Sequence, residues 1–205
     1  SKGWIDTSVS LGEPGFEERQ TLENGVKAAA AGGFTTIMLN PNNQPNPQDQ
    51  SGIKYLKNVT AHQAVSILPV GSFTLNQNGE HLAELYDMQE AGAVSFYDYK
   101  HEVTNANLLK VGLKLIKEYK KTAHNVTCSV SIHHLTLSSN ELETFDANFK
   151  IQPPLRDETE VKQLQKFLTS GVIDVVTSDH TPLTIEHKDL EFDHATAGTI
   201  GLESA

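Results

Sequence analysis

The chain has 205 residues, 38% hydrophobic and 20% charged, a composition typical of a globular protein with one domain or two small ones. Its formal net charge of -10 argues against a nucleic-acid partner, which needs a basic face. The single cysteine, Cys128, excludes an intramolecular disulfide and favours a reducing cytoplasm. Because the sequence shows neither a leader nor a long apolar run, we expect a soluble protein with no membrane segment.

Apolar, strand-like segments alternate along the chain with amphipathic, helix-like segments. The first strand is predicted from Trp4, and further strands over 33–40, 64–72, 92–98, 125–132 and 172–179. Helices are predicted over 19–32, 79–92, 105–121 and 157–171. This alternation indicates a parallel sheet of βα units, and at this point both a barrel and an open doubly wound sheet remain compatible with it.

Several predicted strands end in polar side chains, which meet at one edge of a parallel sheet. Asp179 follows a strongly apolar strand and fits a general base or a metal ligand, although a turn-capping aspartate fits the position equally well. Asp98 ends another strand in the same way, and a solvated loop carboxylate is the simpler interpretation there.

The histidines show no metal-binding spacing. His133 and His134 are adjacent, and neighbours on a strand point to opposite faces, so structural roles are expected for them. The other seven histidines form neither an H-x-H nor an H-E-x-x-H motif.

Two side-chain amides stand in proline-rich segments. Asn42, in LNPNNQP, offers a donor and an acceptor that suit an amide or imide ligand, and turn formation explains it equally well. Gln152, in KIQPPLRDE, lies beside two prolines that also fit a stiff connector before a helix.

Six motifs in collinear order resemble the dihydroorotase family, in the group related to dihydropyrimidinases and allantoinases within the amidohydrolase superfamily. They extend over nearly the whole chain: GWIDTSVSLGEPGFEERQTLENGVKAAAAGGFTTIMLNPNNQP, GAVSFYD, HHLTLSSNEL, FKIQPPLRDE, IDVVTSDHTP and GTIGLESA.

The resemblance implies an α/β fold, a (β/α)8 TIM-like barrel of the metal-dependent hydrolase type, with one or two zinc ions and a small β-sandwich. It also implies hydrolase chemistry on a cyclic amide in pyrimidine biosynthesis, the reversible cyclisation of carbamoyl aspartate to dihydroorotate. Its site assignments are a catalytic and metal-contacting role for Asp179, a metal-contacting carboxylate at or beside Asp98, and substrate contacts by Asn42, Gln152 and Gly198.

Four positions depart from the family pattern. Ser8 and Ser10 stand where the family has two zinc-binding histidines. Gly12 replaces the arginine that pairs with the substrate carboxylate, and Leu183 replaces a histidine that holds the substrate. Because a serine hydroxyl is a poorer zinc ligand than imidazole, and a lost arginine removes a bidentate partner, these changes predict an impaired or inactive site in which zinc is absent.

Residues 1–205 are expected to form a partial barrel domain. About six strands are recognisable where a full barrel has eight, and the terminal β-sandwich is missing. Two strands that carry metal-binding histidines in the family have no counterpart where Thr122 meets Ala123. Because losing them would break barrel closure, we interpret this junction as the place of an omitted segment.

Three functional hypotheses follow. The first is a non-catalytic dihydroorotase homologue that keeps the barrel for assembly, with aspartate transcarbamoylase as a candidate partner and a homo-oligomeric state. The second is an active zinc amidohydrolase acting on dihydroorotate or carbamoyl aspartate through ligands not seen in this chain. The third is a barrel enzyme of unrelated chemistry, against which the collinear motifs argue. Zinc content separates the first two.

Overall fold

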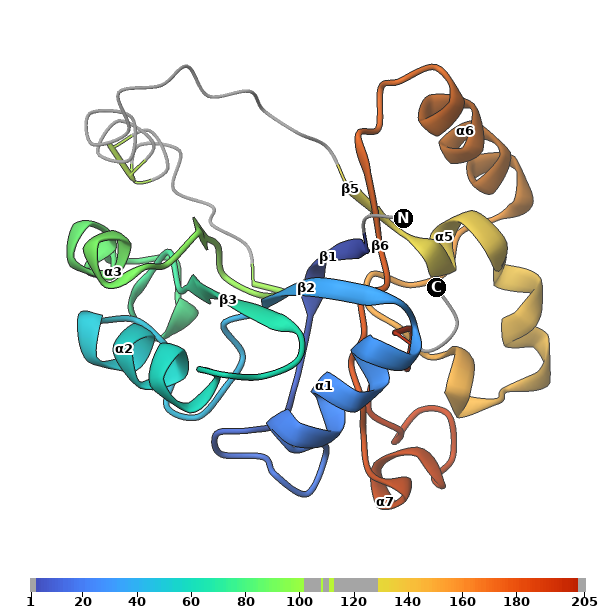
Figure 1. Ribbon diagram of the computed structural model, residues 1–205. Helices are drawn as coiled ribbons and strands as arrows, with labels where there is room; N and C mark the ends of the chain where they lie inside the picture. Colours follow the sequence, from blue (N-terminus) through green and yellow to red (C-terminus); the bar gives the residue numbers. More distant parts are fainter. Residues whose placement is uncertain (1–2, 102–107, 109–110, 113–128, 203–205) are drawn as a thin grey trace.

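Parallel strands form the framework of the protein, a computed structural model that describes residues 3–101, 108, 111–112 and 129–202 (Figure 1). One sheet has the order β1 (Trp4–Val9), β2 (Phe34–Leu39), β3 (Ser66–Gly71) and β4 (Ser95–Phe96), and β5 (Ser129–Ser131) pairs with β6 (Val175–Thr177). A parallel bridge between Val9 and His180 joins the two sheets. The described strands therefore form one parallel arc in which β1 lies between β2 and β6.

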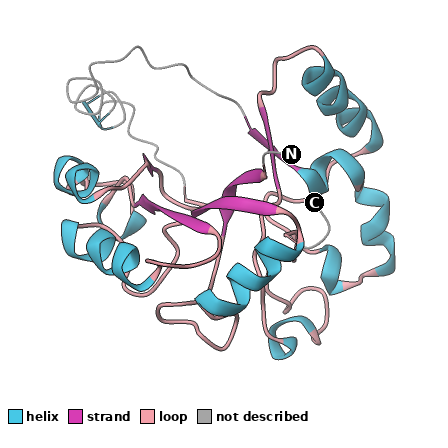
Figure 2. Ribbon diagram, viewed as in Figure 1, coloured by secondary structure: helices cyan, strands magenta, loops and turns pink. Residues whose placement is uncertain are grey.

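Helices surround this arc (Figure 2). The described helices are α1 (Leu22–Ala31), α2 (Gln50–Val59), α3 (Leu85–Ala91), α5 (Ile132–Thr136), α6 (Glu158–Thr169) and α7 (Ile185–Lys188), with 3-10 turns at Leu75–Gln77, Ser139–Thr144 and Ala147–Phe149. None of the helices in the described ranges is long and apolar enough to cross a membrane.

Side-chain caps start the longer helices. The Thr21 hydroxyl accepts a hydrogen bond from the Asn24 N–H at the start of α1, and the Asp157 carboxylate accepts one from the Glu160 N–H at the start of α6. Asp49 does the same for α2 through the Gly52 N–H. Each cap satisfies a backbone donor that has no partner within its helix.

The main core lies between the first three strands and α1. It includes Val9 of β1, Ile37 and Leu39 of β2, and Val26 and Ala29 of α1, all of them buried. A second cluster packs α2 against α3 through Ile53, Leu85 and Met88. The two clusters hold the N-terminal helices against the strands and leave the C-terminal ends of the strands to polar groups.

The structure confirms the predicted βα alternation and an incomplete barrel, with local differences in individual elements. The helix α2 is absent from the sequence prediction, although Ile53, Leu56 and Val59 recur in it at helical spacing. The helix predicted over 79–92 begins only at Leu85. The helix predicted over 105–121, apart from 108 and 111–112, and the junction of Thr122 and Ala123 lie outside the described residues.

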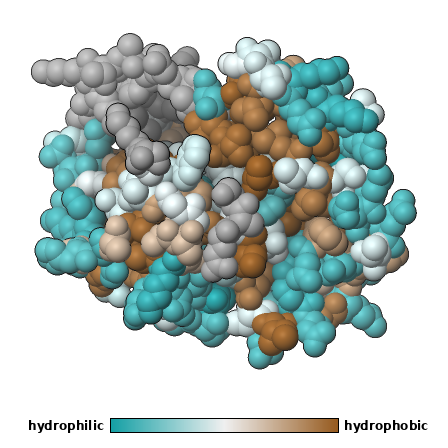
Figure 3. Space-filling view, turned by 45° about the vertical axis from the view of Figure 1, so that its right-hand side comes forward, coloured by the Kyte–Doolittle hydropathy of each residue, from teal (hydrophilic) through white to brown (hydrophobic). Residues whose placement is uncertain are grey.

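Apolar side chains are exposed on two neighbouring strands of the arc. Trp4 and Ile5 of β1 are 70% and 59% exposed, and Val176 of β6 is 37% exposed. Figure 3 shows apolar residues gathered on one face of the molecule. Strands of a closed barrel are covered on both faces, so an incomplete barrel leaves part of their apolar surface uncovered.

The buried carboxylate of Asp6 connects the two parts of the arc. Its Oδ1 accepts a hydrogen bond of 2.9 Å from the Ser8 N–H within β1, and its Oδ2 accepts one of 2.9 Å from the Ser178 N–H at the end of β6. Asp6 is 1% exposed. Hydrogen bonds to an ionised group are stronger than neutral ones, so this carboxylate fixes the relative position of the two strand ends.

The buried imidazole of His180 anchors the chain that follows β6. Its Nδ1 accepts hydrogen bonds from the backbone N–H groups of Gly201 and Leu202, which places the ring proton on Nε2. Nε2 then donates to Oε1 of Gln20 at 2.9 Å. Burial, reinforced by the charge of His133, lowers the pKa of His180 to about 4, so the ring is neutral near pH 7.

We predict that Asp6→Asn destabilises the fold by about 2–4 kcal/mol, because one backbone N–H then faces an amide donor in place of a carboxylate oxygen. Urea denaturation at pH 7 measures the change. Glu23→Gln is the matched control, since Glu23 forms an exposed pair with Lys27; its effect should be far smaller, and equal effects for the two variants would contradict the bridging role.

We predict that the free energy of unfolding decreases as the pH falls from about 6.5 to 4, because His180 is harder to protonate in the folded state. The unfolded imidazole takes up a proton near pH 6.5, whereas the folded one resists protonation until pH 4. Between pH 7 and pH 5 the loss should be about 2 kcal/mol. Denaturation curves at both pH values should show a smaller loss for His180→Gln than for the unmodified chain; the exposed His81→Gln should behave like the unmodified chain.

Candidate functional site

The C-terminal ends of four strands bring five polar side chains together. Ser8 lies in β1 and Ser10 just beyond it, while Asn40 follows β2, Tyr97 follows β4 and Asp179 lies two residues beyond β6. We call these five residues the strand-end network. In barrels built from βα units, this end of the strands carries the active site.

Hydrogen bonds run through the strand-end network in one direction. The Tyr97 hydroxyl donates to Oδ1 of Asn40. Nδ2 of Asn40 donates to Oγ of Ser10 at 3.0 Å and to Oγ of Ser8 at 3.4 Å. The Ser8 hydroxyl then donates to Oδ1 of Asp179 at 3.2 Å. Buried polar groups need such partners, and here the protein itself supplies them.

Burial raises the pKa values of two groups in this network. It raises the pKa of the Asp179 carboxyl, against the opposing effects of the Lys100 charge and the Ser8 hydrogen bond. Burial also raises the pKa of Tyr97, so the phenol remains a donor to Asn40. The backbone of Asp179 has a φ of 48°, in the left-handed region that side-chain-bearing residues rarely adopt. Asp179 is therefore a strained, partly desolvated carboxyl group that accepts a hydrogen bond from a neutral hydroxyl.

The strand-end network does not fit a zinc ion. Protein zinc sites use imidazole, thiolate and carboxylate groups, whereas Ser8 and Ser10 offer neutral hydroxyls already engaged in hydrogen bonds. Within residues 3–101, 108, 111–112 and 129–202, no three His, Cys, Asp or Glu side chains are grouped so that they could hold a metal ion. The described residues therefore give no support to the zinc that the resemblance implies.

The carboxylate of Asp98 binds the backbone of the loop after β3. Its Oδ1 accepts hydrogen bonds from the N–H groups of Phe73 and Thr74 at 3.0 and 2.9 Å, and its Oδ2 accepts one from the Thr74 hydroxyl at 2.5 Å. Asp98 is 7% exposed. These hydrogen bonds show that Asp98 positions the loop after β3. A contact between Asp98 and a metal ion stays a prediction.

Two cavities lie at the C-terminal ends of the strands. The first, which we call the Asp179 cavity, has a volume of about 360 Å³, and its lining includes Ser8, Asp179, His134 and Arg156. The second, the amide-lined cavity, has a volume of about 340 Å³ and is formed by the loops after β1, β2, β3, β4 and β6. Six side-chain amides contribute to its lining: Asn42, Asn43, Gln44, Asn46, Asn76 and Gln77.

The predicted site residues are divided between these cavities. Asp179 lines the first cavity, while Asn42 and Leu183 line the second. Gly198 lies against the second, because a Cβ there would be 3.0 Å from Cδ1 of Leu183. Gln152 is exposed on the loop before Pro153. Substrate contacts by Asn42, Gln152 and Gly198 stay predictions.

Gly12 has no room for a side chain. A Cβ at this position would lie 1.9 Å from the carbonyl oxygen of Phe16 and 2.9 Å from that of Gln20. The Gly12 N–H donates to the Gln20 carbonyl at 2.9 Å, and the Gly12 carbonyl accepts from the Phe16 N–H at 2.8 Å. The loop from Gly12 to Gln20 therefore folds back over Gly12.

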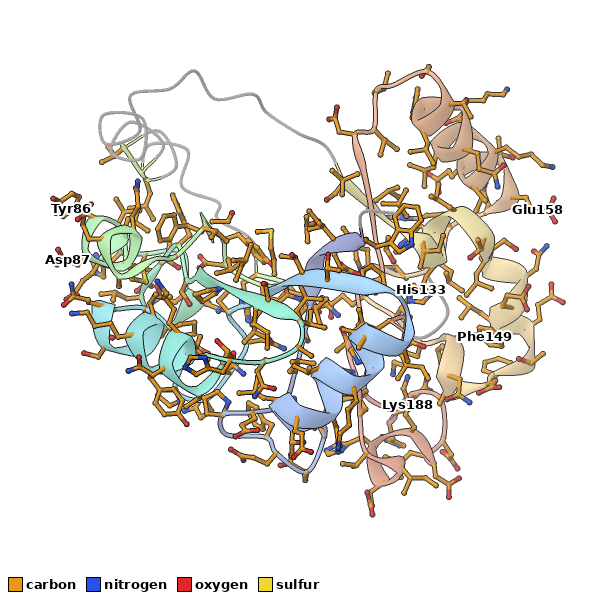
Figure 4. The ribbon with its side chains drawn as sticks, viewed as in Figure 1. Tyr86, Asp87, His133, Phe149, Glu158 and Lys188 are labelled. Carbon is orange, nitrogen blue, oxygen red and sulfur yellow. The ribbon has the colours of Figure 1, made fainter. Side chains whose placement is uncertain are left out.

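The expectation that His133 and His134 stand on a strand is wrong. The strand β5 ends at Ser131 and α5 begins at Ile132, so both histidines lie on a helix (Figure 4). Nε2 of His134 lies 3.1 Å from the Pro153 carbonyl oxygen, which indicates a structural role. A strand of three residues followed directly by a helix has too short a pattern for the sequence to reveal.

Sequence reasoning placed Asn40 among the polar strand ends of a barrel but gave it no role, and it did not assign Tyr97 to the site; both belong to the strand-end network. The available signal was their position, because each comes directly after a strand that ends at the same edge as β1. Polarity alone did not distinguish them from turn residues.

Comparison with known proteins gives consistent results. A family profile described as dihydro-orotase-like matches residues 2–128, more than half of the chain. The dihydroorotase of Pelotomaculum thermopropionicum is 32% identical over 276 aligned residues, and that of Geobacter metallireducens is 28% identical over 277. These alignments cover 99% of this chain, which spans 65% of the length of each relative.

Solved structures share the fold. L-hydantoinase (dihydropyrimidinase) from Arthrobacter aurescens superposes with a TM-score of 0.76 at 20% identity, covering 100% of this chain and 64% of that one. The dihydroorotase of Saccharomyces cerevisiae, solved with 5-fluoroorotic acid, superposes with a TM-score of 0.63 at 15% identity, covering 98% of this chain and 75% of that one. The parallel arc thus has the architecture of a barrel amidohydrolase, and the profile match shows that the chain belongs to the dihydro-orotase-like family.

Proposed function

We propose that this chain is a non-catalytic dihydroorotase homologue of pyrimidine biosynthesis. In this proposal it keeps the barrel framework but not the metal-dependent interconversion of carbamoyl aspartate and dihydroorotate. The observation that carries the proposal is the hydrogen-bonded placement of Ser8 and Ser10. By resemblance, these two positions belong to zinc-binding histidines.

The chemistry of the strand-end network supports this proposal. Metal-assisted hydrolysis needs a cation that lowers the pKa of bound water, and neutral hydroxyls hold such a cation poorly. The Ser8 hydroxyl instead donates to Asp179, the residue that resemblance assigns to proton transfer. The Asp179 carboxyl group, which would transfer the proton, therefore already accepts a hydrogen bond from the Ser8 hydroxyl.

The barrel framework supports a role in assembly. In this proposal the chain carries out no turnover, and assembly is the function that remains for the framework. We propose aspartate transcarbamoylase as the partner, together with self-association of the chain. Light scattering of the purified chain, alone and mixed with the transcarbamoylase, tests both contacts.

We also propose that the barrel is interrupted between β4 and β5. The alignment with the Pelotomaculum relative runs over 276 positions and so exceeds the 205 residues of this chain by 71. A βα unit takes about 30 residues, so the excess corresponds to about two units, as a barrel with eight strands requires.

The alternative is an active zinc-dependent cyclic amidohydrolase. The 32% identity to a dihydroorotase and the position of Asp179 favour it. Its metal ligands would have to come from outside the described residues, since the described ones form no metal-binding group.

We predict that the chain, purified without chelator after expression with added zinc, contains less than about 0.1 equivalent of zinc, because the hydroxyl positions are poor ligands. Neither dihydroorotate nor carbamoyl aspartate should be converted. Elemental analysis and a coupled absorbance assay measure the two results. One or two equivalents of bound zinc with turnover would establish the alternative.

The double variant Ser8→His, Ser10→His provides the matched comparison. It leaves Gly12 unchanged, because that position has no room for a side chain. We expect higher zinc content than in the unmodified chain, since two imidazoles replace two hydroxyls. A variant that folds but takes up no zinc would show that the remaining ligands are also lost.

A further inference from the structure

An exposed phenylalanine, Phe145, has an unfavourable backbone conformation. It ends the 3-10 turn Ser139–Thr144 with a φ of 53°, in the left-handed region where the ends of helices usually have glycine. Its side chain is 71% exposed, so burial within the chain does little to offset the strain. A strained backbone that presents an exposed aromatic ring favours a functional role for the position.

Phe145 belongs to a small apolar surface beside α7. Its ring meets the ring of Phe192 edge to face, with 6.1 Å between the two ring centroids. Leu190, two residues before Phe192, is 49% exposed. We call Phe145, Leu190 and Phe192 the Phe145 surface. The helix α7 lies at the edge of the molecule (Figure 1), where another protein can approach it.

Two lysine side chains fix the two segments that form the Phe145 surface. Nζ of Lys188 donates to the carbonyl oxygens of Ala147 and Lys150, at 2.6 and 3.3 Å. Nζ of Lys150 donates in return to the carbonyl oxygens of Phe192 and Asp193, at 2.7 and 3.0 Å. Because each segment holds the other, the surface is ordered before a partner binds, and this lowers the conformational cost of association.

The segments that carry the Phe145 surface are acidic. Residues 141–150 and 184–193 together contain seven carboxylate side chains and two lysines, Lys150 and Lys188, both of which donate to backbone carbonyls. Six of the carboxylate residues are exposed: Glu143, Asp146, Glu186, Asp189, Glu191 and Asp193. The charge that these segments present to a partner is therefore negative.

We propose that the Phe145 surface binds a basic amphipathic segment of another protein. Apolar side chains of that segment pack on the phenylalanine rings, and its lysines or arginines pair with the neighbouring carboxylates. An apolar centre with a charged rim is the usual organisation of a protein interface. The inference rests on the proposed function, because it names the surface through which a non-catalytic barrel assembles.

The charge of the surface disfavours other occupants. A second copy of the chain carries the same acidic segments and a net charge of -10, so two such surfaces repel each other. Nucleic acids and anionic membranes are also negative and are repelled in the same way. A positively charged protein segment is the occupant that complements both the rings and the carboxylates.

A synthetic peptide of leucine and lysine, about 14 residues long with the leucines on one helical face, tests the proposal on the full chain. Fluorescence anisotropy should give a Kd below about 100 µM. Phe145→Gly should weaken binding by about 10-fold or more, because an aromatic anchor is lost. Its melting temperature should not fall, because glycine adopts a positive φ without strain.

Controls separate the Phe145 surface from general attraction to an acidic protein. Phe167→Ala removes an exposed phenylalanine on α6 and should change the Kd by less than about 2-fold. A peptide with glutamate in place of lysine, and one with serine in place of leucine, should each bind at least about 10-fold more weakly than the leucine–lysine peptide.

The proposal is overturned if the leucine–lysine peptide does not bind at about 1 mM, or if Phe145→Gly binds it as the unmodified chain does. A lower melting temperature of Phe145→Gly would assign Phe145 a structural role and would also overturn it. So would self-association, measured by light scattering, that Phe145→Gly abolishes, since a second copy would then cover the surface. Turnover is measured separately: conversion of dihydroorotate would refute the non-catalytic proposal, whereas selective loss of peptide binding in Phe145→Gly would still support the Phe145 surface.

Discussion

The buried Asp6 carboxylate joins the two parts of the parallel arc, and the arrangement of the strand ends depends on it. One oxygen holds the backbone of Ser8, and the other holds Ser178, which directly precedes Asp179. The hydrogen bond between the Ser8 hydroxyl and Asp179 therefore connects two groups whose backbones are positioned by the same carboxylate. Because such a buried charge is stable only with its partners in place, the β1 and β6 ends form one unit.

Within that unit, the interacting groups are hydroxyls, a side-chain amide and one carboxyl group. Tyr97, Asn40 and Ser8 each donate to the next group, and Asp179 accepts the last hydrogen bond. A network in which buried donors and acceptors satisfy one another is stable without a cation. Family membership and barrel architecture do not by themselves fix the chemistry of the site, because function depends on the groups that the fold positions.

The loop from Gly12 to Gln20 depends on the absence of a side chain at Gly12. Without a side chain at Gly12, the Phe16 carbonyl approaches closely enough for the loop to fold back, and this places Arg19 beside Asn42. The cavity that holds Asn42 is separate from the one that contains Asp179. The two cavities are therefore lined by different residues.

The sequence by itself determined the βα alternation, the family, and the position of Asp179 just beyond an apolar strand, because these depend on local periodicity and on motifs in order. It did not predict α2, although Ile53, Leu56 and Val59 recur there at helical spacing, or the helical position of His133. Only the tertiary structure decided that Asn40 and Tyr97 join Ser8, and that Arg19 reaches the cavity of Asn42. The physical reason is distance along the chain: Asp6 and Ser178 are 172 residues apart, and no local pattern encodes a hydrogen bond that only folding brings together.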